Sequence, residues 1–321
     1  MTPNRRLTIV AALLVVEFAL VGAMFNALGR GGPGTAGGHW RGMRPFGIGS
    51  RAMAAEPAQH LDRSFETGPS PHVYIDDATA EVTVTAQAGS TSVHVAEQTF
   101  RTGYVDESSN LRIERTGDAV RIERQPHAHH IFMFGSFRRL LSVTAPSGAR
   151  VEVAAAATTH VSGLRERVSL HSRNGALTIA DQRGDVTAST SNGRIELHDV
   201  TAPNLQLTTR NGRIELDRVR SANVNVATRN GRIEAAASTI GGGNIETRNG
   251  RIEMVLARNS NLTVSAQSRR GKVHFASHPA GSSSDDESGT GRSRTVRFGN
   301  GAGRLDVATG NGPISISIEG V

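Results

Sequence analysis

A heptapeptide that recurs at a fixed distance constrains this chain more than any other feature. TRNGRIE occupies residues 209–215, 228–234 and 247–253, and a near copy, TSNGRIE, occupies 190–196. Asn-Gly pairs begin at Asn174 and recur every 18 or 19 residues up to Asn249. A period of about 20 residues in a strand-forming sequence is typical of a solenoid, in which each repeat is one coil stacked on the last. We therefore predict an all-β fold, a parallel β-solenoid (β-helix) with coils of about 19 residues.

Each coil contains two predicted strands, one before and one after the Asn-Gly pair. The strand after the pair begins Arg-Ile-Glu, and alternate side chains of a strand face opposite sides of the sheet. The isoleucine of each coil should therefore point inward and lie about 4.8 Å from its equivalents in the coils above and below. The predicted core column consists of Ile195, Ile214, Ile233 and Ile252.

The Asn-Gly pair is predicted to turn the corner between the two strands. Both residue types tolerate positive φ, and stacked asparagine side chains can hydrogen-bond along a column of coils. A β-hairpin is the competing interpretation of Asn-Gly, but near-identical strands after every pair favour coils. The predicted corner residues are Asn192, Gly193, Asn211, Gly212, Asn230, Gly231, Asn249 and Gly250.

The charged residues of the repeat should form parallel columns on the outside of the stack. One column is Arg194, Arg213, Arg232 and Arg251, a second is Glu196, Glu215, Glu234 and Glu253, and a third is Arg173, Arg210, Arg229 and Arg248. Adjacent arginine and glutamate columns can neutralise each other, which makes a solvated face the simpler interpretation. The first two columns are also the candidate ligand face, with an anionic envelope polysaccharide or another surface protein as partner. Interleaved glutamates and repeats without aromatic residues disfavour nucleic acid.

The N-terminal part of the chain reads as a membrane segment. Residues 7–28 form an apolar run, interrupted by Glu17, that is long enough to span a bilayer, and residues 1–6 would be cytoplasmic. A cleaved signal peptide is the alternative, because Val21, Gly22 and Ala23 supply small residues before a cut. Flanking arginines on both sides leave the orientation open, and the strand-rich remainder favours export. We expect a single-pass protein of the cell membrane with one transmembrane helix and an extracytoplasmic folded domain.

Three further segments are expected after the membrane segment. Residues 29–71, rich in Gly, Pro and Arg, predict a flexible linker, and residues 72–155 alternate irregularly and predict a β cap region at the start of the stack. Solenoid repeats should fill 156–321, with a disordered polar insertion at 276–295. After the insertion the period resumes, since LDVATGNGPIS at 305–315 aligns with LQLTTRNGRIE at 205–215.

Few residues suggest chemistry. The chain has no cysteine, and we find none of the common catalytic or nucleotide-binding motifs, so we predict no catalytic residue, no cofactor and no metal site. His127, His129 and His130 form the one dense histidine cluster, and the tripeptide at 183–185 is Arg-Gly-Asp. Both are weak signals. Polysaccharide-cleaving enzymes do use β-helices, but acidic residues that recur once per coil do not make the unique cluster that catalysis needs.

Residues 65–321 resemble a bacterial adhesin-like family with β-strand repeats, a domain of unknown function. The resemblance rests on LLSVTAPSGARVEV at 140–153, VSLHSRNGALTI at 168–179, the repeated NGRIE and the closing LDVATGNGPISISI. It implies a β-solenoid of the cell envelope. Many relatives carry Asn-Gly-Asp or Ser-Gly-Asp at the corner, whereas this chain carries Asn-Gly-Arg and has a more basic face.

The sequence leaves two functions from different classes open beside the enzyme. The first is a non-enzymatic, membrane-anchored solenoid that acts in surface interaction or in envelope organisation. The second is a self-assembling scaffold similar to the bactofilins, in which the coil ends of different molecules stack. The two differ in whether the ends of the stack are covered.

Overall fold

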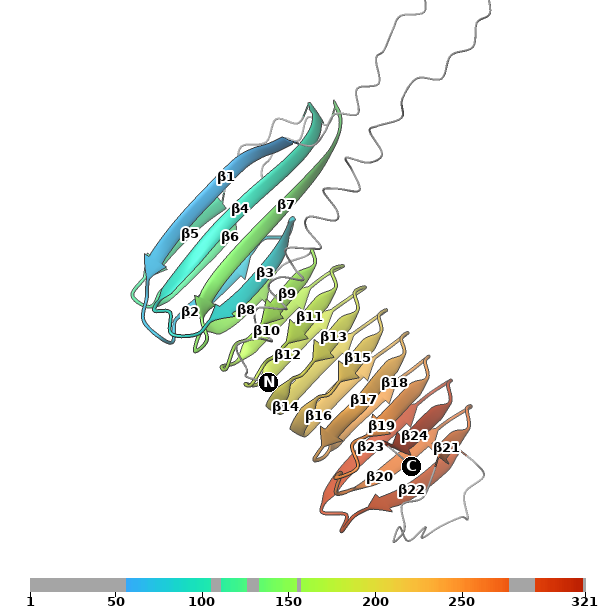
Figure 1. Cartoon of the computed structure of the whole chain (residues 1–321). Coiled ribbons are helices and arrows are strands. Elements are labelled where there is room, and N and C mark those ends of the chain that lie inside the picture. The colour runs from blue at the N-terminus through green and yellow to red at the C-terminus, as the bar shows by residue number, and fades with distance from the viewer. Residues whose placement is uncertain (1–55, 105–110, 126–132, 155–156, 277–291, 320–321) are drawn as a thin grey trace, which may run out of the picture. The chain divides into compact units, whose positions relative to one another are not determined.

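The structure is a computed structural model, and it describes residues 56–104, 111–125, 133–154, 157–276 and 292–319. Every regular element in these ranges is a β-strand, and the strands form two long sheets that face each other across one core (Figure 1). No helix among the described residues is long and apolar enough to cross a membrane. The predicted membrane segment at 7–28 and the histidine cluster at 127–130 lie outside the described residues.

The first sheet, which we call sheet A, contains one strand from every coil and additional strands at one end. In spatial order its strands are β1 (Glu56–Glu66), β4 (Ser92–Tyr104), β7 (Met133–Pro146), β3 (Ala80–Gln87), β9 (Thr159–Ser162), β11 (Leu177–Ala180), β13 (Ile195–His198), β15 (Ile214–Asp217), β17 (Ile233–Ile240), β19 (Ile252–Leu256), β24 (Ile314–Ile318) and β21 (Val273–Ala276). All neighbours are parallel except β1 with β4 and β4 with β7.

The second sheet, sheet B, contains the strand that precedes each corner. In spatial order its strands are β5 (Leu111–Thr116), β6 (Ala119–Arg124), β2 (His72–Asp76), β8 (Arg150–Ala154), β10 (Val168–Ser172), β12 (Val186–Thr190), β14 (Thr201–Thr209), β16 (Arg220–Thr228), β18 (Gly243–Thr247), β23 (Gly303–Thr309), β20 (Leu262–Ser268) and β22 (Ser293–Phe298). Only the pairs β5 with β6 and β20 with β22 are antiparallel.

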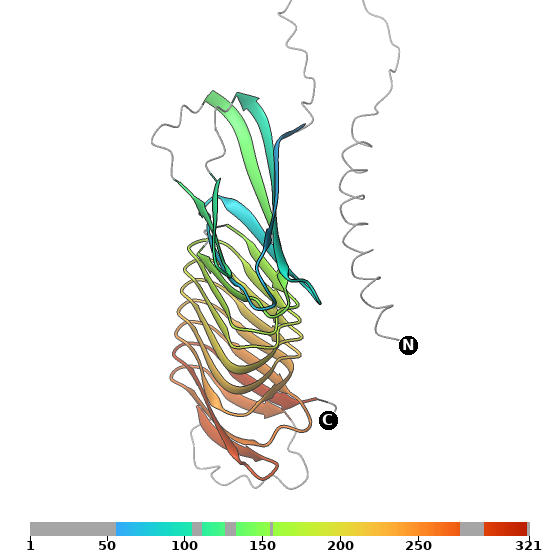
Figure 2. The same cartoon turned by 90° about the vertical axis from the view of Figure 1, so that its left-hand side faces the viewer.

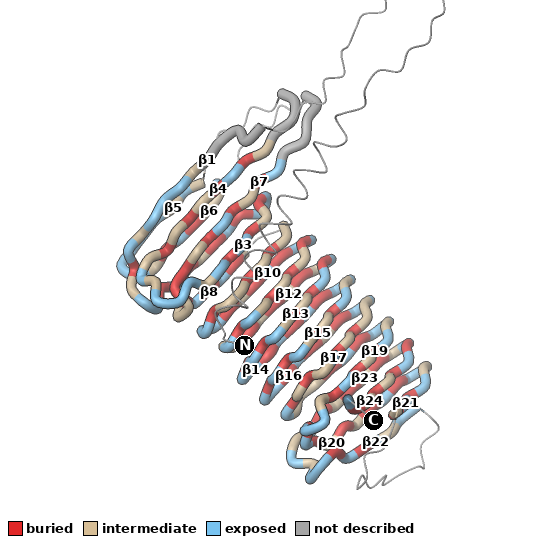
Figure 3. The backbone as a smooth tube through the Cα atoms, viewed as in Figure 1, coloured by how far each residue is buried: buried red, intermediate tan, exposed pale blue. Residues whose placement is uncertain are grey.

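Equivalent residues of successive coils lie directly above one another, which makes the molecule a parallel β-solenoid (Figure 2). Ile214 pairs with Ile195 on one side and with Ile233 on the other, and these side chains are completely buried. Burying one such side chain stabilises the fold by roughly 1.5 to 3 kcal/mol. The alternation of buried and outward positions along each strand (Figure 3) therefore carries the core through the whole stack.

Both ends of the stack depart from the order of the sequence in the same way. The last strands of the chain, β23 and β24, do not lie at the end but between the coil of β18 and β19 and the coil of β20 and β21. At the other end, β2 and β3 lie between the coil of β6 and β7 and the coil of β8 and β9. The first and last coils of the sequence are thus enclosed by coils that lie closer to the middle of the chain.

Antiparallel strands are added outside these enclosing coils. β22 covers the edge of β20, β5 covers β6, and β4 with β1 covers β7. Covered edges resist pairing with other chains. Among the described strands, the coil edges of β6 and β20 on sheet B are therefore paired, whereas β21 ends sheet A with β24 as its described neighbour.

The N-terminal strands correct two of the expected boundaries. The expected linker at 29–71 is not a linker over its last part, because β1 runs from Glu56 to Glu66 and Phe65 packs partly buried against the core. The residues between Leu61 and Phe65 are all polar and exposed, so the segment shows no regular alternation from which the sequence could predict a strand. The region 72–155 does supply the covering strands, but it also supplies true parallel coils, since β8 pairs directly with β10.

The insertion expected at 276–295 is shorter in the structure. Ala276 ends β21 and β22 begins at Ser293, so regular structure reaches into both ends of the expected segment. Residues 277–291 lie outside the described residues. β22 pairs with β20 from Leu262 opposite Phe298 to Gln267 opposite Ser293.

The corner glycines are required for a different reason from the one expected. The glycines of the Asn-Gly pairs do not have positive φ; the non-glycine residues with positive φ are Asp181, Asp199, Arg218 and Ala237, at the opposite corner. At Gly212 an added Cβ would lie 1.8 Å from the carbonyl oxygen of Gly193 in the preceding coil. The same 1.8 Å contact recurs at Gly231 and Gly250. Glycine is needed because successive coil backbones approach closely at this corner, and a sequence period does not show that approach.

Two ladders of side-chain hydrogen bonds hold the corners together. The Nδ2 of Asn211 donates to the Oδ1 of Asn192 at 2.8 Å, and the Nδ2 of Asn230 donates to the Oδ1 of Asn211 at 2.7 Å. The expected asparagine ladder is therefore present, and it extends to Asn249. The threonine of TRNGRIE forms a second ladder that we did not expect: buried Thr228 donates from Oγ1 to the carbonyl oxygen of Gly212 at 3.2 Å.

Candidate functional site: an arginine groove on sheet B

The candidate ligand face predicted from Arg-Ile-Glu lies on sheet A, and its charges pair with one another. The glutamate two residues after each arginine accepts from it within the same coil, with distances of 3.1 Å for Arg194 and Glu196, 2.8 Å for Arg232 and Glu234, and 3.0 Å for Arg251 and Glu253. Arg213 pairs with Glu215 and also lies 3.7 Å from Glu234 in the next coil. The hydrogen bond that the Arg213 guanidinium donates to the Glu215 carboxylate raises the pKa of Arg213. These two columns neutralise each other, so they leave little unpaired charge for a ligand.

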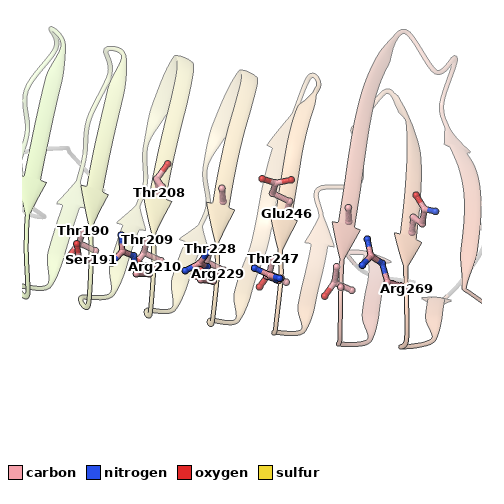
Figure 4. A pocket seen from close by; sticks show the side chains of 16 residues that line it. Thr190, Ser191, Thr208, Thr209, Arg210, Thr228, Arg229, Glu246, Thr247 and Arg269 are labelled. Atoms are coloured by element: carbon pink, nitrogen blue, oxygen red, sulfur yellow. The ribbon is translucent and has the colours of Figure 1, made fainter.

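The third arginine column lies at the other side of the corner, in a groove on sheet B. The groove has a volume of about 910 Å³, and its lining includes Arg210, Arg229, Arg248 and Arg269. Each of these arginines directly follows the last residue of a sheet B strand. Figure 4 shows Arg210, Arg229 and Arg269 at this end of their strands. Strands of one parallel sheet end at the same edge, and the four side chains therefore share that edge.

Backbone hydrogen bonds determine the order of the arginines along the stack. The amide of Asn230 donates to the carbonyl of Arg210, and the amide of Asn249 donates to the carbonyl of Arg229, each at 2.9 Å. Arg210, Arg229 and Arg248 thus occupy consecutive coils, about 4.8 Å apart. Gly310 takes the next position because β23 is inserted there, and Arg269 follows.

These arginines have no counter-charge within the described part of the chain. No carboxylate that the structure describes lies within 4.0 Å of any of the four guanidiniums. All four residues are exposed. Two like charges 4.8 Å apart in water repel by about 0.9 kcal/mol, from 332/(80 × 4.8), and dissolved salt weakens this repulsion. The column therefore carries an electrostatic cost that an anionic ligand would remove.

The rest of the groove is lined by both polar and apolar side chains. The outward residues two positions before the arginines are Thr208, Ala227 and Glu246, followed in the stack by Ala308 and Gln267. In Figure 4, Thr208 and Glu246 lie on their strands further from the corner than the arginines. None of the described lining residues is aromatic. The groove can form ion pairs and hydrogen bonds, and it offers no ring for a base to stack on.

Part of the pattern that identifies this site is present in the sequence, although the most regular charged positions of the repeat, those of Arg-Ile-Glu, lie on the other face. Arg194 has a glutamate two residues after it, whereas Arg210 and Arg229 have Thr208 and Ala227 two residues before them. Arg248 departs from this difference, because Glu246 stands two residues before it, and only the structure shows that no described carboxylate lies within 4.0 Å of its guanidinium. The sequence did not place Arg269 in this column. Its corner has Arg270 and Gly271 in place of an Asn-Gly pair, and β23 lies between its coil and that of Arg248.

The remaining sequence candidates do not form a site. In the Arg-Gly-Asp tripeptide, the Asp185 carboxylate accepts from the backbone amide of Asn204 at 3.1 Å and from Arg167 at 3.3 Å. An added Cβ at Gly184 would lie 2.4 Å from the carbonyl of Glu166, so the tripeptide is part of a tight corner. Within the described ranges, no group of three or more metal-binding side chains comes together.

The fold and the two charged faces define the class of protein, which is a repeat β-solenoid with in-register coils. At its corners the coil backbones approach closely and the asparagines form a ladder of hydrogen bonds. Within that class the family is shown by the sequence itself. The family model described as Toastrack DUF4097 matches residues 72–317, and the chain belongs to this family. This match confirms the resemblance to a β-repeat family of unknown function.

Solved structures resemble this chain only distantly. A candidate adhesin from Bacteroides fragilis is 11% identical with a TM-score of 0.45, and the match covers 81% of this chain and 97% of that one. A candidate cell adhesion protein from Clostridium sporogenes is 10% identical with a TM-score of 0.28, covering 81% and 100%. A candidate lipid-binding protein from Parabacteroides distasonis is 11% identical with a TM-score of 0.38, covering 81% and 94%. Among curated protein sequences no match is found.

Proposed function

We propose that the chain is a non-enzymatic, adhesin-like interaction protein of the cell envelope, and that its solenoid displays a binding face outside the cytoplasmic membrane. The observation that carries the proposal is the arginine column of sheet B, from Arg210 to Arg269, which has no counter-charge among the described residues. A stack of coils is suited to this function because it repeats one side chain at a fixed interval over a long surface.

A binding function fits the groove better than catalysis does. Its side chains repeat from coil to coil and point outward in parallel, whereas catalysis needs different groups that converge on one reacting atom. Glu246 is the one carboxylate among the described residues that line the groove. We therefore propose that the groove holds its ligand without changing it.

We also propose that residues 7–28 anchor the protein in the membrane, on the basis of the apolar run in the sequence. Fusing alkaline phosphatase after residue 50, before β1 begins, tests the topology. High phosphatase activity in intact cells is expected, because the enzyme folds correctly only after export. An inactive fusion that is nevertheless produced in full length would place the solenoid in the cytoplasm and remove the adhesin-like function.

Binding to the cell envelope tests the proposed function directly. Full-length protein in a non-ionic detergent should bind purified envelope polysaccharides or whole envelopes, and the binding should weaken as salt is added. Deleting the gene should change the attachment of the cells or their envelope. A protein that binds no envelope component and whose deletion changes neither property would contradict the proposal.

A further inference from the structure

We infer that the groove of sheet B binds a linear anionic glycan whose chain runs along the stack, across the coils, with its acid groups on Arg210, Arg229, Arg248 and Arg269. This inference rests on the proposed function and names its ligand class, its site and the direction in which the ligand lies.

The direction follows from the register of the coils. Arg210, Arg229 and Arg248 stand on consecutive coils about 4.8 Å apart, and Arg269 stands two coils beyond Arg248, past Gly310. The four charges therefore span about 19 Å along the stack. A ligand that meets all of them must be an extended chain perpendicular to the strands, with acid groups that recur along its length.

The other lining groups favour a glycan over a nucleic acid. Thr208, Ser191 and Gln267 offer hydroxyl and amide groups, which suit the hydroxyl groups of a sugar chain. Single-stranded nucleic acid is usually held by aromatic side chains on which bases stack, and no described residue of the lining is aromatic. A chain of acidic sugars matches both the arginine edge and the hydroxyl and amide groups of the lining.

Glu246 supplies an internal check on this assignment. Its carboxylate is in the groove beside the strand end that leads to Arg248, and it should repel an anionic chain. Replacing it by glutamine removes one negative charge and keeps the shape of the side chain. If the groove binds the glycan, this substitution strengthens binding, an effect that a purely structural role of the groove would not produce.

The experiment measures the binding of full-length protein in non-ionic detergent to polygalacturonate, with neutral dextran as the control polymer. Replacing Arg210, Arg229 and Arg248 together by glutamine should weaken binding roughly tenfold, because three exposed ion pairs are lost. Galacturonate oligomers of increasing length should bind more tightly until they can span the groove. Dextran should not bind at any length.

A matched variant controls for net charge. Replacing Arg194, Arg232 and Arg251 by glutamine removes the same number of arginines from the same kind of coil on sheet A. This variant should bind polygalacturonate within about twofold of the unchanged protein, and E246Q should bind about twofold more tightly. Thermal unfolding of all variants establishes that each is folded.

The outcomes separate this inference from the proposed function. Equal loss in both triple variants, or no loss in the groove variant while unchanged protein still binds envelopes, overturns the arginine groove and leaves the surface function standing. If single-stranded oligo-dT binds as tightly as polygalacturonate and depends on the same arginines, the glycan assignment is overturned. If the unchanged protein binds neither envelopes nor polygalacturonate, both proposals fail.

Discussion

The outer faces of sheets A and B belong to the same coils, but arginine is paired with glutamate on sheet A and has no described counter-charge on sheet B. On sheet A, Arg232 lies 2.8 Å from Glu234 on its own strand. On sheet B, Arg229 follows a strand whose outward residue two positions earlier is Ala227, and its guanidinium has no described counter-charge. The backbone, the spacing and the type of charge are the same. The two faces differ in whether a glutamate of the protein lies beside each arginine.

This comparison separates charges that serve the fold from charges that remain available. Paired columns of arginine and glutamate let like charges stack at the strand spacing with little repulsion. An unpaired column keeps the repulsion, and the core must tolerate it. The apolar core is continuous beneath both faces, so one core stabilises the coils under the paired columns and under the column that has no described counter-charge.

The largest expected effect comes from the corner that joins the two faces. In Gly212→Ala the new Cβ would meet the carbonyl oxygen of Gly193 at 1.8 Å, which forces neighbouring coils apart. We expect the free energy of unfolding to fall by about 3 kcal/mol, measured by urea denaturation. Thr208→Ala, at an exposed site on the same coil, should change it by less than about 0.5 kcal/mol. An unchanged midpoint for Gly212→Ala would show that the faces do not depend on this close approach.

A smaller effect is expected from the asparagine ladder beside the corner. In Asn230→Asp the side chain can no longer donate to the Oδ1 of Asn211, and two oxygens then face each other. Denaturation should show a loss of about 1 kcal/mol at pH 7. Asn225→Asp makes the same change of charge at an exposed position on sheet B, outside the ladder. Comparable losses in both variants would argue that the added charge matters and the ladder does not.

Substituting one arginine on each face compares the paired column with the column that has no described counter-charge. Arg232→Gln removes a paired charge and should lower the free energy of unfolding by a few tenths of a kcal/mol. Arg229→Gln removes a charge that is repelled by Arg210 and Arg248, and should raise it by a similar amount at low salt. Adding 0.5 M NaCl should reduce both differences. The opposite signs are the test: if both substitutions destabilise, the sheet B column has a partner after all.

The smallest expected effect is a pH dependence on the paired side. Arg218 donates to Asp199 at 2.7 and 2.8 Å and holds the pKa of that carboxyl below its usual range. A carboxyl with a lowered pKa adds stability above its unfolded value of about 3.9, and this stability is lost as the pH falls through the folded value. Because half of the Asp199 side chain is exposed, the contribution is a few tenths of a kcal/mol.

Comparing Asp199→Asn with the unchanged protein from pH 6 to pH 3 measures this contribution. The unchanged protein should be the more stable one at pH 6, and the two should converge below pH 4, because the protonated carboxyl no longer gains from Arg218. A difference that stays constant over the whole range would mean that the ion pair is not its source.

Much of the fold could be predicted because the repeat expresses it in several independent residues. The alternation around Ile214, the stacking of Asn211 on Asn192 and the pairing of Arg232 with Glu234 all follow from a register that the period defines. The groove was harder to predict, because its defining property is a missing partner. Whether a charge is unpaired depends on all of its neighbours in space, including those from coils that are distant in the sequence.

The sequence by itself determined the solenoid, its two sheets, its core column and the composition of each coil. Only the tertiary structure decided which coil lies next to which at the two ends, and so where β2, β3, β23 and β24 belong. The physical reason is that every coil offers nearly the same edge of hydrogen-bonding groups and the same apolar core. Local chemistry therefore cannot distinguish one neighbour from another. In the structure β20 lies beyond β23, and this order brings Arg269 into the arginine column.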